Sequence, residues 1–303
     1  MKRLLILSGK GGTGKTTVAG AFIRLSGAEA YADCDVDAPN LHLTMGWDVE
    51  PDRAYHYGLD KAVIDSGKCI GCGLCMEKCR FGAIVRKAGG YAVDPLSCEG
   101  CAVCELVCPN KAVRMEPAVA GDLMLYADGR RAFSTARLRM GSGTSGKLVT
   151  EVKKRMDGAA PDAPLAIIDG SPGIGCPVIA SLSGVDLALI VAEPSVSGIS
   201  DMGRIVETAG KSGVPVAVCV NKHDTNPGNT AKIEDYCKER GLPFVGRIPF
   251  DPAAVVATND GMTVVDVDCP AGTAVREVYR GTLGVLSGAG GSAGYRGKIV
   301  EIE

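Results

Sequence analysis

The sequence predicts an α/β fold, in which a mostly parallel sheet carries helices on both faces and a small α+β domain is inserted. Three observations support this fold class. A glycine-rich, phosphate-binding loop follows an apolar run near the start of the chain. Continuous apolar runs then alternate with stretches of helical periodicity. Finally, eight of the 13 cysteines lie between positions 69 and 108 in two evenly spaced groups, which indicates metal ligands and not disulfides.

The glycine-rich loop occupies residues 8–17, SGKGGTGKTT, and matches the phosphate-loop pattern G-x-x-x-x-G-K-[ST]. Its glycines let backbone N–H groups turn inward around a phosphate. Lys15 is expected to reach the terminal phosphates, and Thr16 to place its hydroxyl on Mg²⁺. A turn that binds nothing is the alternative, but the strand before the loop and the helix after it give the context of a P-loop NTPase. The predicted nucleotide-binding residues of the loop are Gly9, Lys10, Gly11, Gly12, Thr13, Gly14, Lys15, Thr16 and Thr17.

Predicted helices and strands alternate along the rest of the chain. Continuous apolar runs predict buried strands, and such runs are typical of a parallel sheet that is covered on both faces. The predicted strands are residues 4–7, 28–32, 165–168, 187–192, 214–220 and 244–248, with a further strand and hairpin turn at 123–126 and 127–130 and an edge strand at 298–303. The predicted helices, where apolar residues recur at helical spacing, are residues 17–26, 145–156, 199–210, 231–240 and 271–286.

Two of the predicted strands end in acidic residues. Asp33 and Asp35 follow the strand at 28–32, and Asp169 follows the strand at 165–168 in a Walker B arrangement. The carboxyl ends of parallel strands form the ligand-binding edge of such sheets. We therefore expect Asp169 to hold the Mg²⁺ ion, through water, together with Thr16. Asp33 is expected to support Asp35 or the surroundings of the ion.

The cysteine-rich stretch is a tandem repeat, because its first and second halves match at an offset of 29 residues, as in Cys69 and Cys98. Each half has the spacing C-x₂-C-x₂-C-x₃-C of bacterial ferredoxins, and Pro109 closes the second. In that geometry three cysteines hold one cluster and the fourth holds the other. We predict a ferredoxin-like insert with two [4Fe–4S] clusters, one held by Cys69, Cys72, Cys75 and Cys108, and the other by Cys98, Cys101, Cys104 and Cys79.

Zinc is the competing interpretation, since C-x₂-C pairs also build zinc ribbons. However, a third and a fourth cysteine at the same spacing in both halves do not fit a four-cysteine zinc site. A module of about 50 residues also has too little apolar surface to fold firmly alone. The clusters are therefore expected to serve as its core.

Lys10 adds a second lysine close to Lys15, which is costly unless a bound anion compensates the repulsion. With Lys10, the loop reads K-G-G-x-G-K-[ST]. Nearly the whole chain resembles the MinD/ParA/nitrogenase-iron-protein class of dimeric ATPases. This class is also grouped with the cobyrinic acid a,c-diamide synthase type of nucleotide-binding domain. This resemblance implies that Lys10 reaches across a homodimer interface to the partner's nucleotide. It also implies that Asp35 orients the attacking water. The expected catalytic residues are thus Lys10, Lys15 and Asp35.

The resemblance further implies where the base of the nucleotide binds. Asn221 follows the strand at 214–220 and corresponds to an asparagine that contacts the adenine, and the loop with Pro249 and Asp251 corresponds to the one that closes over it. Residues 221–224 also read as the guanine motif N-K-x-D, so GTP stays open as an alternative to ATP. Cys176 corresponds either to the ligand of an interfacial cluster or to a small buried residue, and we assign it no metal.

Charge and hydropathy restrict the partners. The net charge of −2 provides no basic field for a nucleic acid or an anionic membrane surface. No stretch approaches the roughly 18 apolar residues of a membrane span. We expect a cytoplasmic protein with no nucleic-acid or membrane partner. Residues 1–60 and 117–303 are expected to form the ATPase domain, and residues 61–116 the ferredoxin-like insert.

The expected function is ATP hydrolysis coupled to electron transfer from the two clusters to a redox partner. The insert follows the strand end that carries Asp35, so closure of a dimer on ATP is expected to move the clusters or to alter their exposure. Two alternatives stay open: a carrier or assembly ATPase for iron–sulfur or other metal cofactors, similar to the Mrp type, and a MinD-like positioning ATPase with redox-sensing or structural clusters. No residue identifies the redox or client partner.

Overall fold

The computed structural model describes residues 1–288, and its main element is a nine-stranded sheet with the order β13-β12-β11-β1-β10-β2-β9-β8-β3. Every neighbouring pair from β13 to β9 is parallel, while β8 and β3 at the edge run antiparallel. The parallel strands are β1 (Lys2–Leu7), β2 (Ala30–Asp33), β9 (Ala132–Leu138), β10 (Leu165–Asp169), β11 (Leu187–Ala192), β12 (Val216–Asn221) and β13 (Phe244–Ile248). The edge strands are β3 (Asp52–Tyr57) and β8 (Val119–Ala127).

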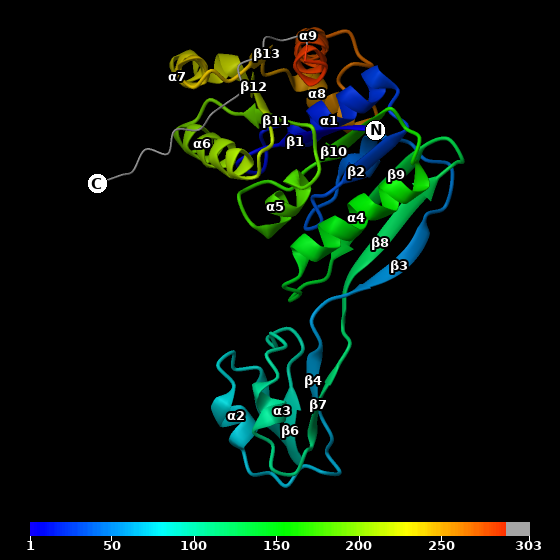
Figure 1. Cartoon of the computed structure of the whole chain (residues 1–303), viewed down its shortest axis with the longest axis vertical. Helices are drawn as coiled ribbons and strands as arrows, with labels where there is room; N and C mark the ends of the chain where they lie inside the picture. The colour runs from blue at the N-terminus through cyan, green and yellow to red at the C-terminus, as the bar shows by residue number, and fades with distance from the viewer. Residues whose placement is uncertain (289–303) are drawn as a thin grey trace.

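Helices cover both faces of this sheet (Figure 1). One face packs against α4 (Ser145–Ala159), α5 (Cys176–Leu182), α6 (Val196–Lys211) and α7 (Pro227–Glu239). The other packs against α1 (Lys15–Ser26), α8 (Pro252–Asn259) and α9 (Pro270–Leu286). Strand β1 has a continuously apolar sequence because both of its faces are buried: Leu5 and Leu7 lie in the core on one face of the sheet, and Leu4 and Ile6 lie in the core on the other. The predicted α/β architecture is therefore confirmed.

Two strands of the nine-stranded sheet escaped the sequence prediction. Strand β3 lies at the sheet edge, and all of its side chains except that of His56 are exposed, so it lacks the apolar alternation of a half-buried strand. Strand β9 is buried but includes Ser134 and Thr135, which interrupt its apolar run. The predicted strand and turn before β9 are confirmed, because β8 and β9 form a hairpin in which Asp128 accepts hydrogen bonds from the backbone N–H groups of Arg130 and Arg131. The predicted edge strand at 298–303 lies outside the described residues.

The chain between β3 and β8 leaves the sheet and forms a separate small unit, seen below the main domain in Figure 1. Its strands and short helices are β4 (Lys61–Ile64), α2 (Leu74–Lys78), β5 (Ile84–Lys87), β6 (Gly90–Val93), α3 (Val103–Leu106) and β7 (Val113–Glu116). Strand β4 pairs with β7, and β5 pairs with β6. The insert thus attaches to the edge pair β3–β8 and not directly to the end of β2, because residues 34–51 first cross to that edge through a 3₁₀ turn at Leu41–Thr44.

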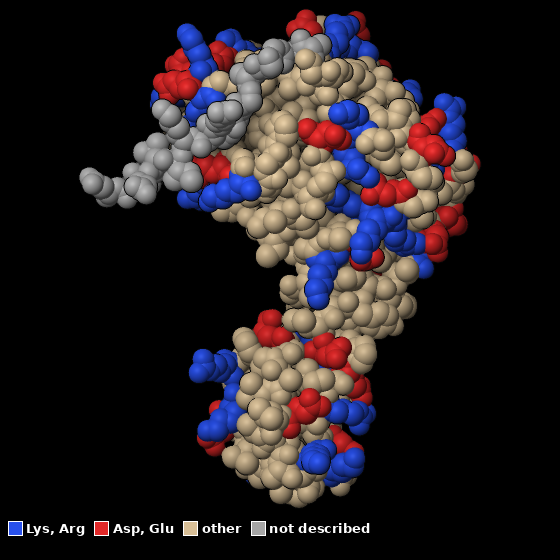
Figure 2. All heavy atoms as spheres, in the orientation of Figure 1, with Lys and Arg blue, Asp and Glu red and all other residues tan. Residues whose placement is uncertain are grey.

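The surface of both units carries mixed charges. In Figure 2 basic and acidic side chains lie next to one another on the right-hand side of the main domain and over the insert, while the middle of the main domain is largely uncharged. A narrower waist joins the two units. Among residues 1–288, no helix has the length and apolar character needed to cross a membrane.

Candidate functional site

The phosphate loop connects β1, which neighbours the central strand β10, to α1, which begins at Lys15. Gly14 has a φ of 89°, in the left-handed region that favours glycine. A Cβ at this position would also lie 2.2 Å from Nδ2 of Asn221. Both the backbone conformation and the close approach of Asn221 therefore require glycine at position 14.

Lys15, Thr16 and Asp169 meet directly beneath this loop. Nζ of Lys15 lies 2.5 Å from Oδ1 of Asp169, and the Thr16 hydroxyl donates to Oδ2 of the same carboxylate over 2.7 Å. Asp35 is farther away, with its Oδ2 3.9 Å from Nζ of Lys15. Burial alone would lower the pKa of Lys15, but the carboxylates of Asp169, Asp33 and Asp35 outweigh it and raise the pKa. Lys15 therefore stays a cation in a buried acidic surround, and the structure brings these predicted residues together.

Asp33 has a different position from Asp35. It is completely buried, and its carboxylate accepts hydrogen bonds from the backbone N–H groups of Asp35, Asn40 and Leu41. Burial, followed by the charge of Asp169, raises the pKa of Asp33 to about 7. Asp33 therefore fixes the loop that carries Asp35. Asp35 itself lies beside Lys15, and burial raises its pKa against the opposing effect of that lysine.

Lys10 is held within its own chain in this structure. Its Nζ lies 2.6 Å from Oε2 of Glu193 and 3.0 Å from Oγ of Ser195, at the start of α6. Lys222 approaches the same carboxylate, with its Nζ 3.5 Å from Oε1, and donates to the carbonyl oxygen of Gly12 over 2.8 Å. Burial would raise the pKa of Glu193, but the two lysines outweigh it and lower the pKa. Sequence reasoning missed Glu193 as the partner of Lys10, because nothing local connects positions 183 residues apart.

A cavity of about 920 Å³, which includes space open to solvent, adjoins the phosphate loop. The predicted residues that line it are Gly12, Gly14, Thr17, Asn221, Pro249 and Asp251. Asn221 donates from Nδ2 to the carbonyl oxygen of Thr13 over 2.7 Å, so it also braces the loop. The Asp251 carboxylate accepts from the N–H groups of Ala253 and Ala271, which fixes the starts of α8 and α9.

Phe250 lies between Pro249 and Asp251 in the loop that is expected to close over the base, and it also lines this cavity. Its backbone N–H donates to Oδ1 of Asp224 over 2.7 Å. Asp224 is the residue whose carboxylate would bind the base in a guanine motif. This carboxylate is instead hydrogen-bonded to the loop that borders the cavity.

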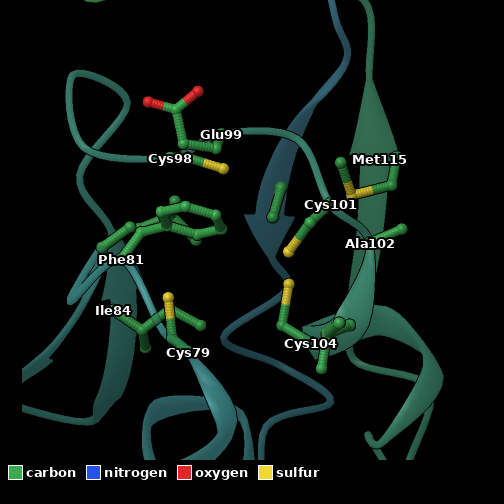
Figure 3. Close-up of a pocket in the computed structure, with 13 residues that line it drawn as sticks. Cys79, Phe81, Ile84, Cys98, Glu99, Cys101, Ala102, Cys104 and Met115 are labelled. Carbon is green, nitrogen blue, oxygen red and sulfur yellow. The ribbon is translucent and has the colours of Figure 1, made fainter. Parts of the chain in front are cut away.

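The eight clustered cysteines line two cavities, of about 340 and 330 Å³ including open space. In Figure 3 the thiols of Cys79, Cys98, Cys101 and Cys104 point toward one shared space. The other cavity is lined by Cys69, Cys72, Cys75 and Cys108. These are the two groups that the repeat predicts. Within residues 1–288 all cysteines are free, and no three or more cysteine, histidine or acidic side chains converge on a site for a single metal ion.

Cys176 lies outside both groups. It begins α5, directly before Pro177, and is exposed, not buried. A Cβ on Gly146, at the start of α4, would lie 3.3 Å from the Cβ of Cys176. The start of α5 is therefore in contact with the start of α4.

Known proteins share this sequence pattern and this fold. Residues 4–264 match the family model described as the CobQ/CobB/MinD/ParA nucleotide binding domain. An uncharacterized protein of Methanocaldococcus jannaschii is 32% identical over 284 residues, which cover 91% of this chain and 95% of that protein. An iron-sulfur cluster carrier protein of Pyrococcus horikoshii is 24% identical over 311 residues, which cover 96% of this chain and 89% of that protein.

Among solved structures, the cell division ATPase MinD of Pyrococcus furiosus matches with a TM-score of 0.56 and 18% identity, covering 94% of this chain and 99% of that one. The septum site-determining protein MinD of Pyrococcus horikoshii, complexed with Mg-ADP, matches with a TM-score of 0.54 and 18% identity, covering 92% and 94%. At these identities the likeness establishes the fold alone.

Proposed function

The chain belongs to the CobQ/CobB/MinD/ParA nucleotide-binding domain family, and we propose that it couples ATP hydrolysis to electron delivery from two [4Fe–4S] clusters to a redox partner. The family match confirms the predicted MinD/ParA-type P-loop ATPase. One observation carries the proposal beyond ATP hydrolysis. Besides a complete phosphate loop, the chain has two cavities that are each lined by four of the eight clustered cysteines.

The residues beneath the phosphate loop support hydrolysis of ATP. Lys15 would exchange its contact with Asp169 for the terminal phosphates, because both groups compete for the same ammonium. Thr16 and Asp169, already hydrogen-bonded, would hold the Mg²⁺ ion, which supplies charge neutralisation at the phosphates. Asp35, at 3.9 Å from Lys15, would orient the attacking water.

The partner subunit completes the ATPase site in this proposal. Lys10 would leave Glu193 and reach the nucleotide of a second copy, so that the nucleotide lies at the interface of a homodimer. Such a lysine stabilises the charge that develops on the transferred phosphate. Two-fold symmetry then supplies two lysines to two sites.

The donor sets fit [4Fe–4S] clusters. Each cavity offers four thiols, the number that such a cluster binds, and its other lining residues, such as Ile84 and Val113, are mostly apolar. Three of the seven buried residues in the core of the insert are cysteines, namely Cys75, Cys98 and Cys104. Bound clusters would therefore supply much of that core. When bound, clusters of this type supply one-electron transfer.

Electron delivery is favoured over release of a cluster because the chain provides four thiols for each cavity, a complete ligand set. The second candidate is a carrier ATPase for iron–sulfur clusters, in which the cluster is cargo. It is supported by the likeness to the Pyrococcus horikoshii carrier protein, which extends over 96% of this chain.

Two assays on anaerobically purified protein test the proposal, and the second of them separates the two candidates. We expect the wild type to hydrolyse ATP. Lys15→Ala should lose both ATP hydrolysis and nucleotide binding, because the ammonium is the main charge that contacts the phosphates. We also expect reduced protein to pass electrons to an acceptor dye while its iron content stays constant. ATP-stimulated transfer of iron and sulfide to an apoprotein acceptor would instead establish the carrier function. An undiminished affinity of Lys15→Ala for ATP would contradict both.

A further inference from the structure

The insert contacts the ATPase domain through its two linkers and also through the second cysteine group, which consists of Cys79, Cys98, Cys101 and Cys104. Lys61, on β4, donates from Nζ to the carbonyl oxygen of Cys98 and to that of Gly141, the latter over 3.3 Å. Gly141 belongs to the loop between β9 and α4, and its φ is 74°. A Cβ at this position would lie 2.9 Å from the carbonyl oxygen of Leu96. One ammonium thus joins the backbone of the insert to the backbone of the ATPase domain where the two are in contact.

The second cysteine group is held on its other side as well. Gly100 has a φ of 68°, and a Cβ there would lie 2.5 Å from the carbonyl oxygen of Asp60 in the linker that follows β3. Residues 96–100 are therefore packed between this linker and the loop at 139–144. Glu99 also shares an open cavity with this loop and with Asp37, two residues beyond the expected catalytic Asp35. The segment that carries Cys98 therefore lies against the loop at 139–144 and shares a cavity with Asp37 of the ATPase domain.

The loop at 139–144 is connected at its far end to the segment that follows Asp169. It leads into α4, whose Gly146 contacts Cys176 at the start of α5. Lys153, a buried lysine of α4, donates to the carbonyl oxygens of Ala180, Ser181 and Ser183 at the end of α5. Helix α5 is therefore fixed to α4 at both of its own ends.

Helix α5 in turn follows residues 170–175, which touch the phosphate loop. The backbone N–H of Gly173 donates to the carbonyl oxygen of Ser8 over 3.0 Å. The hydroxyl of Ser171 donates to the carbonyl oxygen of Cys34, which lies between Asp33 and the expected catalytic Asp35. Contacts are thus continuous from the phosphate loop, through α5 and α4, to the second cysteine group.

We propose that the loop at 139–144 is the joint through which bound nucleotide displaces the second cysteine group, and that Lys61 is the positioning residue that couples the two domains there. The inference deepens the proposed function and rests on it. When residues 170–175 rearrange around a nucleotide, α5 and α4 move together and shift the loop against residues 96–100. The segment 69–75, which carries Cys69, Cys72 and Cys75, is held by hydrogen bonds within the insert; for example, Asn110 donates to the carbonyl oxygen of Lys68. We therefore expect this segment to respond less to nucleotide than residues 96–100.

Hydrogen exchange followed by mass spectrometry tests this joint on the anaerobically purified full chain, with Mg²⁺ and a non-hydrolysable ATP analogue. Suitable reporters are the amides of Cys98, bonded to Asp94, and of Ser142, bonded to Arg139. We expect the analogue to change exchange at 94–101 and 139–146 but not at 69–75. In Lys61→Met, exchange at 94–101 should be about tenfold faster and should no longer respond to the analogue, because a charged donor has been lost. Exchange at 170–176 should still respond.

Lys87→Met is the matched control, since Lys87 is an exposed lysine of the same insert, at the turn between β5 and β6. It should behave as the wild type. If Lys61→Met does not fold, Gly141→Ala tests the same contact from the ATPase side and should also remove the response at 94–101. The joint is wrong if that response persists in both variants, or if wild-type residues 170–176 respond while 94–101 do not. Absence of any response to the analogue would contradict the proposed function itself, and the joint with it.

Discussion

At the scale of single residues, the candidate ATPase site contains charged side chains that form ion pairs with residues distant in the sequence, as Lys15 does with Asp169 and Lys10 with Glu193. Sequence spacing was sufficient to nominate Lys15, Thr16 and Asp169, because the phosphate loop and the Walker B strand are local patterns. It also indicated that Asp33 supports Asp35, but not which backbone N–H groups it binds. It could not show that Glu193 holds Lys10, because that contact depends on how the strands are ordered in the sheet.

Asp33 predicts a pH dependence of stability. Its pKa is raised from 3.8 to about 7 in the folded protein, so the folded state binds a proton more tightly than the unfolded chain does. The stability that this proton contributes is fully present below about pH 4 and is lost as the pH rises through about 7. Between pH 6 and 8 the nucleotide-free wild type should lose about 1 kcal/mol that Asp33→Asn does not lose. Denaturant unfolding of both proteins at the two pH values measures this, and equal losses would contradict it.

Glu193 predicts an effect on assembly. The Lys10–Glu193 pair must open before Lys10 reaches a partner, so Glu193→Gln should promote ATP-dependent dimers. Because the pair is partly exposed, we expect dimers at a severalfold lower protein concentration, consistent with an ion pair worth up to about 1 kcal/mol. Sedimentation velocity with an ATP analogue measures the shift. Glu207→Gln, an exposed change on helix α6, which follows Glu193 in the chain, is the control. A Glu193→Gln protein that dimerises no better than this control would count against the pair as a restraint.

At the scale of elements, the strands with continuous apolar runs were predictable, and the polar or exposed ones were not. Strands β1, β10, β11 and β12 are buried on both faces, which forces an apolar sequence. Strand β3 is exposed and β9 includes buried hydroxyls, so neither has a periodicity that identifies it. The cysteine groups could be predicted because their ligand spacing is itself the signal.

The cysteine groups predict which substitutions act together. Cys69→Ala and Cys108→Ala should remove the same cluster although they are far apart in sequence, because both residues line one cavity. Cys79→Ala and Cys98→Ala should remove the other. Each single variant should lower the iron content from about eight atoms per chain toward about four. Iron analysis and EPR spectroscopy distinguish the two classes, and Cys219→Ala, in a buried strand, should leave the iron content unchanged.

At the scale of the whole molecule, two units meet at the edge pair β3–β8 and at the loop between β9 and α4 (Figure 1). The sequence indicated that the insert interrupts the nucleotide-binding domain, but it placed the junction beside the end of β2. The crossing of residues 34–51 to the sheet edge could not be foreseen, because β3 lacks a recognisable pattern. Within a single chain, the contacts of residues 1–288 therefore offer the linkers and the loop at 139–144 as routes by which nucleotide influences the clusters.

A redox titration followed by EPR, on protein that is nucleotide-free, bound to Mg-ADP or bound to Mg²⁺ and a non-hydrolysable ATP analogue, tests the coupling of the two units most directly. We expect two cluster signals, one of which shifts its midpoint potential by about 60 mV between nucleotide states, which corresponds to a coupling of about 1.4 kcal/mol. Potentials that stay the same in all three states, in protein shown to bind the nucleotides, would contradict the coupling.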